Sequence, residues 1–105
     1  MNTKQTSQLK EKFLSQTAKI SWLELQTFFA RGVLYEVDAE LDLIEIAVMI
    51  QRDEASKIAQ LIDSGKLGQP SNAKAKDWYD KKQTLWSLVV APFVLVQTLE
   101  SNDEI

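Results

Sequence analysis

Three carboxylates alternate with apolar or small residues in the stretch VDAELD: Asp38, Glu40 and Asp42. On an extended chain, side chains two residues apart point to the same side, so these three could together hold a hard divalent cation. The stretch departs from the calcium loop of an EF-hand, because Leu43 and Met49 stand where that loop needs glycine and a bidentate glutamate. The weak match favours a solvated hairpin edge, whose charges prevent edge-to-edge pairing.

Glu45 interrupts the apolar run LDLIEIAVMI and is a second candidate for chemistry. On a strand it would be partly buried beside Leu43 and Ala47, and a buried carboxylate needs a partner. Arg31 and Arg52, the only two arginines, are the candidates. A structural ion pair is favoured over an active-site carboxylate, because such pairs are common outside active sites.

The segment KAKDWYDKK interleaves aromatic residues with lysines and could bind single-stranded nucleic acid by stacking and phosphate contact. Its members for this purpose are Lys74, Lys76, Trp78, Lys81 and Lys82. Asp77 and Asp80 halve the charge, and a helix would turn Trp78 and Tyr79 toward the core. Nucleic-acid binding is therefore not favoured.

Tryptophan is frequent, at positions 22, 78 and 86, and most of these rings are expected to anchor the core. A tryptophan left exposed would mark an interface. The candidate interaction residues are Trp22, Arg31, Glu45, Trp78 and Trp86.

Cysteine and histidine are absent from the 105 residues, which excludes disulfides, Cys/His zinc sites, thiol nucleophiles and Ser-His-Asp triads. No phosphate loop or other cofactor motif is present, so we expect no cofactor and a non-catalytic function. The N-terminal residues lack the apolar core of a secretory signal, which favours a cytoplasmic protein.

Charge is segregated along the chain. Residues 1–31 hold five Lys or Arg and two Glu (+3), and residues 32–54 hold one Arg and seven Asp or Glu (−6). Residues 55–82 hold six Lys and three Asp (+3), and the whole chain has a net charge of −3. Net acidity argues against a nucleic-acid partner.

Four segments have helical patterns: 3–18, 21–31, 53–64 and 71–82. Ser21 and Glu24 have the spacing of a capping box, Asp53 and Ser71 are candidate N-caps, and Gly32 and Gly65 are placed to end helices. A short strand is expected at 66–69. The segment 41–50 fits a helix or a strand, and its β-branched residues favour a strand paired with 33–37 across a turn at 38–40.

The uncharged stretch LWSLVVAPFVLVQ is too short to span a membrane, since its unbroken apolar run is nine residues, and its valines favour a strand buried on both faces. Pro92 cannot donate to a strand ladder, so a bulge or break at Ala91-Pro92 is expected to split the strand. Base rates favour a trans bond there.

Several stretches together resemble a bacterial domain-of-unknown-function family, numbered twenty-two eighty-eight. They include SWLELQ (21–26), VDAELDLIEIA (37–47), and VVAPFVLVQ (89–97), in which Phe93 stands where tryptophan is expected. The resemblance covers about residues 12–100. It implies one cytoplasmic domain and supplies no activity, cofactor or site residue.

The sequence therefore predicts one α+β domain over residues 1–100, with a disordered acidic tail at 101–105. Two helices, a hairpin, a helix, a short strand, a helix and a long strand would build a mainly antiparallel or mixed sheet. The predicted function is protein interaction, with a homo-oligomer or another protein as partner. The alternatives are a metal- or ligand-dependent enzyme that uses the acidic cluster, and a weak nucleic-acid binder.

Overall fold

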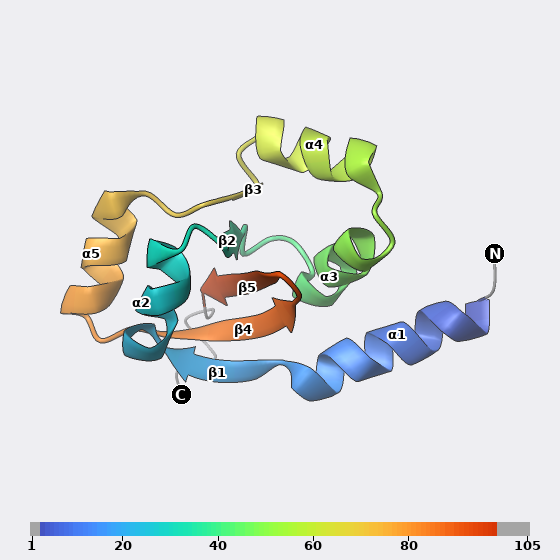
Figure 1. The fold of residues 1–105 in the computed structure, drawn as a ribbon, viewed down its shortest axis with the longest axis horizontal. Coiled ribbons are helices and arrows are strands. Elements are labelled where there is room, and N and C mark those ends of the chain that lie inside the picture. Colours follow the sequence, from blue (N-terminus) through green and yellow to red (C-terminus); the bar gives the residue numbers. More distant parts are fainter. Residues whose placement is uncertain (1–2, 99–105) are drawn as a thin grey trace.

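The computed structural model describes residues 3–98, in which five helices and a five-stranded mixed sheet form an α+β domain (Figure 1). The elements in order are α1 (Thr3–Gln16), β1 (Ala18–Ser21), α2 (Trp22–Ala30), β2 (Leu34–Val37), α3 (Leu43–Gln51), α4 (Ala55–Asp63), β3 (Leu67–Gly68), α5 (Asn72–Asp80), β4 (Thr84–Val90) and β5 (Phe93–Thr98). The predicted α+β class is confirmed. The acidic tail predicted at 101–105 lies outside the described residues.

The sheet has the order β1-β4-β5-β2-β3, and only the pair β2–β5 is parallel. Its centre is the hairpin β4–β5, which the sequence predicted as one long strand split at Ala91-Pro92. The predicted break is confirmed. The bond between these two residues is cis, so the expectation of a trans bond was wrong. A tight turn is the usual setting of a cis proline.

The segment 41–50, predicted as a strand, folds instead as the helix α3. The Asp42 side chain accepts hydrogen bonds from the backbone N–H groups of Ile44 and Glu45, which starts the helix. Ile46 and Ala47 then face the core. Burial of an apolar helix face outweighs the β-propensity of the branched residues. The predicted hairpin is therefore absent, and β2 pairs with β5 and β3.

The predicted first helix, 3–18, ends at Gln16, and the chain continues as the edge strand β1, which the sequence did not indicate. Ser21 is the N-cap of α2, but its side chain makes no capping hydrogen bond, so the predicted capping box does not form. Asp53, a predicted N-cap, has a positive φ of 56° and precedes the actual cap residue, Glu54. The cap at Ser71 is confirmed, since its hydroxyl accepts a hydrogen bond from the Lys74 N–H.

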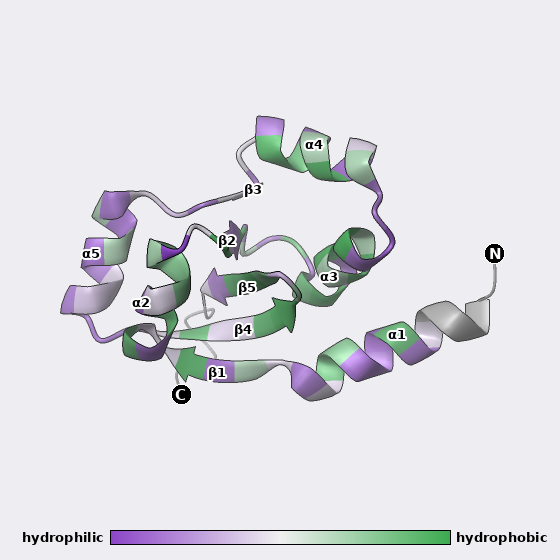
Figure 2. Cartoon of the chain, in the orientation of Figure 1, coloured by the Kyte–Doolittle hydropathy of each residue, from purple (hydrophilic) through white to green (hydrophobic). Residues whose placement is uncertain are grey.

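Helices cover both faces of the sheet and divide the core in two. On one face, α2 and α5 pack Trp22 and Trp78 against each other, with ring centroids 5.2 Å apart, over Leu85 and Val96. On the other face, α1 and α3 cover Leu88, Leu95 and their neighbours. Figure 2 shows the hydrophobic residues concentrated in the two central strands and in α3, while polar residues colour much of α1 and α5.

Within residues 3–98, no helix combines the length and the apolar character that a membrane span requires.

Candidate interaction surface

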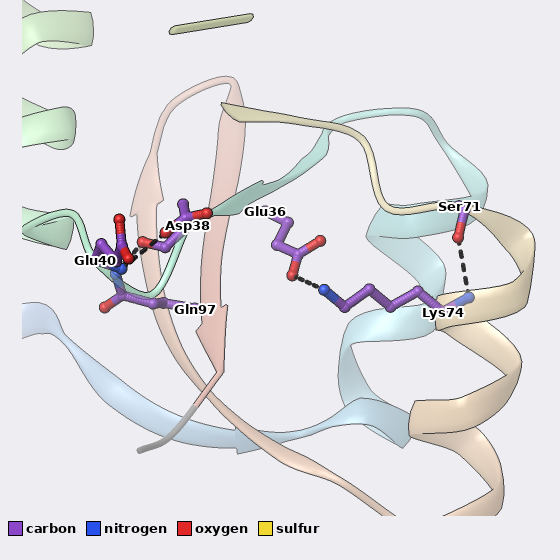
Figure 3. A network of polar contacts seen from close by, with 6 residues as sticks. All are labelled: Glu36, Asp38, Glu40, Ser71, Lys74 and Gln97. Carbon is purple, nitrogen blue, oxygen red and sulfur yellow. Dashed lines mark hydrogen bonds and ion pairs between the residues drawn. The ribbon is translucent and has the colours of Figure 1, made fainter. Parts of the chain in front are cut away.

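The three carboxylates weighed as weak candidates for metal binding lie in and beside the loop that joins β2 to α3. The Asp38 carboxylate accepts a hydrogen bond from the Glu40 N–H, and Asp42 caps α3. The Gln97 amide donates to the backbone carbonyl of Asp38 at 2.9 Å (Figure 3). It also donates to the backbone carbonyl of Leu41 at 2.7 Å, and the two bonds hold the loop against β5. Among residues 3–98, no three acidic side chains gather where they could hold a metal ion. The carboxylates of Asp38 and Asp42 therefore stabilise local backbone.

Glu45 is exposed, contrary to the prediction of partial burial, because α3 turns it toward solvent. Its carboxylate lies 3.9 Å from the Lys10 ammonium of α1, and neither arginine is its ion-pair partner. Both side chains are about half exposed, so this pair contributes little to stability. It does show that α1 and α3 present opposite charges side by side.

The lysine segment forms α5, and Trp78 is only 2% exposed, so its ring is closed to a stacked base. Lys74 forms a short ion pair with Glu36 (Figure 3). Lys76 contacts Asp80 at 2.7 Å; the hydrogen bond and the charge of that carboxylate raise the pKa of the Lys76 ammonium. Lys81 pairs with Asp77 at 3.2 Å. These contacts occupy much of the positive charge that a phosphate backbone would need.

A hollow of about 460 Å³ lies between the end of α1, the start of α3 and the neighbouring strands. We call it the Trp86 hollow. It is lined by Leu14, Thr17, Leu41, Asp42, Leu43, Ile44, Trp86 and Gln97. Leu14 is 67% exposed at its edge, and Trp86 is half-buried in its floor. The Lys19 ammonium lies 5.0 Å from the Trp86 ring centroid.

The two sides of the Trp86 hollow carry opposite charge. Lys10 of α1 and Lys19 of β1 flank the lining residues on one side, and we call these two lysines the basic wall. Asp42, which lines the hollow and caps α3, and Glu45 in the first turn of α3 lie on the other side, and we call them the acidic wall. The floor between the walls is apolar apart from Thr17 and Gln97, so the arrangement combines an apolar centre with a charged rim.

A second hollow, the α4 groove, has a volume of about 410 Å³ and is lined by Tyr35, Ile50, Asp53, Glu54, Ala55, Ile58, Ala59, Ile62, Leu67 and Phe93. Tyr35 and Phe93 meet edge to face at its floor, with centroids 5.4 Å apart. None of the residues of α4 is buried, and Ile62 is 47% exposed. This groove is therefore an apolar surface beneath a helix that has no buried residue.

The structure brings few of the predicted interaction residues together. Trp86 lines the Trp86 hollow and Glu45 stands on its rim, whereas Trp22 and Trp78 are core residues and Arg31 is exposed after α2. Sequence reasoning missed Leu14. Its signal was the adjacent pair Phe13-Leu14, because neighbouring side chains on a helix point in different directions and only Phe13 is buried.

Comparison with known proteins shows that the chain resembles a protein family and a solved structure. The family model described as "Protein of unknown function (DUF2288)" matches residues 8–98, which confirms the resemblance. The solution NMR structure of PA1075 from Pseudomonas aeruginosa is 45% identical, with a TM-score of 0.78, over 97% of this chain and 94% of that one. No curated protein matches the chain. The chain therefore belongs to the DUF2288 family.

Proposed function

We propose that the chain is a non-catalytic, cytoplasmic protein-interaction domain that binds its partner through the Trp86 hollow. One observation carries the proposal: Leu14, 67% exposed, stands beside the half-buried Trp86 ring in a concave, mainly apolar hollow with a charged rim. Tryptophan and large apolar side chains in such a setting dominate binding energies at protein interfaces.

The elements that form the Trp86 hollow support binding because they are fixed before a partner arrives. Trp86 lies on β4, between β1 and β5. Leu41 belongs to the loop that the Gln97 amide holds, and Asp42 caps the helix that carries Ile44. A surface fixed in this way loses little conformational entropy on binding, which favours affinity.

The chemistry of the lining also favours binding over catalysis. Among residues 3–98, Asp42 is the only charged residue that lines the Trp86 hollow, and its carboxylate already accepts two backbone hydrogen bonds. General acid–base catalysis needs a titratable group within reach of the substrate proton, and often a second group that orients it. The other polar members, Thr17 and Gln97, are suited to hydrogen bonding with a bound surface.

A photo-crosslinking amino acid placed at position 14 in living cells tests the proposal. Leu23 of α2 is a matched control site, because it is 57% exposed and does not line the Trp86 hollow. We expect a discrete crosslinked adduct from position 14 and none from position 23. The absence of an adduct at position 14, or the same adducts at both positions, would contradict the proposal.

A further inference from the structure

We infer that the partner in the Trp86 hollow is a second copy of this chain, joined through a two-fold symmetric interface. The inference rests on the proposed function and names its partner. It is carried by the opposite charge of the two walls and by the exposed leucine that stands on one of them.

The charges of the Trp86 hollow fit a two-fold interface. In such an interface the same surface patch faces itself, turned by 180° about an axis in the plane of contact. With that axis running between α1 and α3, the basic wall of each copy faces the acidic wall of the other. Two attractive contacts then form in place of like-charge repulsion, and complementarity of this kind selects partner and register.

The wall residues retain charge for such a contact. Within residues 3–98, Lys19 and Asp42 form no ion pair inside the chain, and Lys10 and Glu45 are 3.9 Å apart with about half of each side chain exposed. Glu11 lies three residues before Leu14 and therefore on the same side of α1, so it offsets part of the positive charge of the basic wall.

The apolar residues fit the same arrangement. Leu14 belongs to α1 and stands on the side of the basic wall, whereas Leu41 and Ile44 belong to the side of the acidic wall. The two-fold axis that exchanges the walls also places Leu14 of each copy opposite Leu41 and Ile44 of the other. Each Leu14 then enters the partner's hollow beside Trp86, and the interface acquires an apolar centre inside two charged contacts.

The α4 groove does not carry the same inference. Its charged lining residues, Asp53 and Glu54, are both acidic, and a two-fold contact would bring like charges together. The Lys57 ammonium of α4 lies 2.8 Å from the carboxylate of Glu54, the N-cap residue of that helix.

Charge reversal tests the inference. One variant carries Lys10→Glu with Lys19→Glu, and a second carries Glu45→Lys; Asp42 is left unchanged because it caps α3. We expect the wild type to sediment as a dimer at about 100 µM. The Lys10→Glu, Lys19→Glu variant should self-associate at least about tenfold more weakly, because like-charged walls then meet. Glu45→Lys should weaken association less, because its acidic wall then carries no net charge. An equimolar mixture should associate more strongly than either variant alone, because one of its two wall contacts is again attractive.

Lys57→Glu on α4 is the matched control, and it should leave the dimer unchanged. Circular dichroism of each variant establishes that loss of association is not loss of folding. A wild type that stays monomeric at about 500 µM, or a mixture of folded variants that associates no more strongly than either variant alone, would overturn the second-copy inference. Neither result contradicts the proposal that the Trp86 hollow is an interaction surface. That proposal is contradicted separately if the crosslinker at position 14 yields no adduct.

Discussion

The Trp86 hollow and the α4 groove are of similar size and both are mainly apolar, yet they differ in what forms their sides. The Trp86 hollow is bordered by β4, by the capped start of α3 and by a loop that Gln97 holds. One side of the α4 groove is a helix with no buried residue, which packs mainly against α3 and β3. Apolar lining alone therefore does not identify a binding surface.

The difference lies in rigidity and in the pattern of charge. Few buried contacts make α4 one of the less stable parts of the fold, so its groove is best understood as an incompletely closed edge of the core. The Trp86 hollow combines fixed walls with charges of opposite sign on its two sides. That pattern favours a partner of complementary charge, and the partner that we propose is a second copy.

The largest expected effect is a loss of folding stability when Leu67, which lies beneath the α4 groove, is shortened to alanine. Leu67, 3% exposed, belongs both to its lining and to the core. Leu67→Ala should lower the free energy of unfolding by about 2–4 kcal/mol, because it removes buried methyl groups and leaves a cavity. Leu14→Ala should cost less than about 0.5 kcal/mol, because that side chain is exposed. Urea denaturation measures both. Equal losses would show that Leu14 is a core residue and not part of a binding surface.

The next largest effect is on self-association. Leu14→Asp should weaken the dimer by roughly 30-fold, about 2 kcal/mol, as expected for the loss of a central apolar contact. Ile62→Asp, the corresponding change in the α4 groove, should leave the dimer unchanged. Sedimentation velocity over a concentration series gives both dissociation constants. A dimer that Ile62→Asp weakens more than Leu14→Asp would move the interface to the α4 groove.

A smaller effect is expected where the acidic wall is anchored. Asp42→Ala should destabilise the fold by about 1 kcal/mol, because the first N–H groups of α3 lose their acceptor. Asp42→Asn keeps an acceptor at the cap and should retain most of the stability. Thermal unfolding followed by circular dichroism compares the two. If both variants melt alike and well below the wild type, the negative charge matters more than the cap.

The smallest effect is that of salt. Raising the ionic strength from about 0.05 to 0.5 M should weaken the wild-type dimer a few-fold, because the wall charges are exposed and screened. The Lys10→Glu, Lys19→Glu variant should respond in the opposite direction, since salt then screens repulsion. Light scattering at the two ionic strengths measures this. A wild-type dimer that strengthens with salt would contradict attraction between the walls.

Much of the fold could be predicted from local signals. Ser71, Gly32 and Gly65 marked helix ends, and Pro92 marked the break between β4 and β5. The segment 41–50 was predicted wrongly because its branched residues suit a strand, while its true signal, Asp42 as a helix cap, was interpreted as part of a charged hairpin edge. Local propensity gives way to tertiary burial in such a segment.

The candidate surface could be predicted only in part. Trp86 and Glu45 were singled out from their residue types, but the contact between Lys19 and Trp86 depends on the pairing of β1 with β4, which no local pattern encodes. The opposite charge of residues 1–31 and 32–54 is visible in the sequence. Only the folded chain shows that the two segments form opposite walls of one hollow.

Paramagnetic relaxation between copies tests the central claim most directly. The chain has no cysteine, so Ser15→Cys provides a unique nitroxide site beside Leu14 on α1. Spin-labelled chain without isotope is mixed with ¹⁵N-labelled wild type, so that any broadening arises between copies. We predict broadening of the Asp42–Glu45 amides and not of those in α4, with recovery when the nitroxide is reduced. Unchanged amides throughout the ¹⁵N-labelled copy, or broadening confined to α4, would contradict the account.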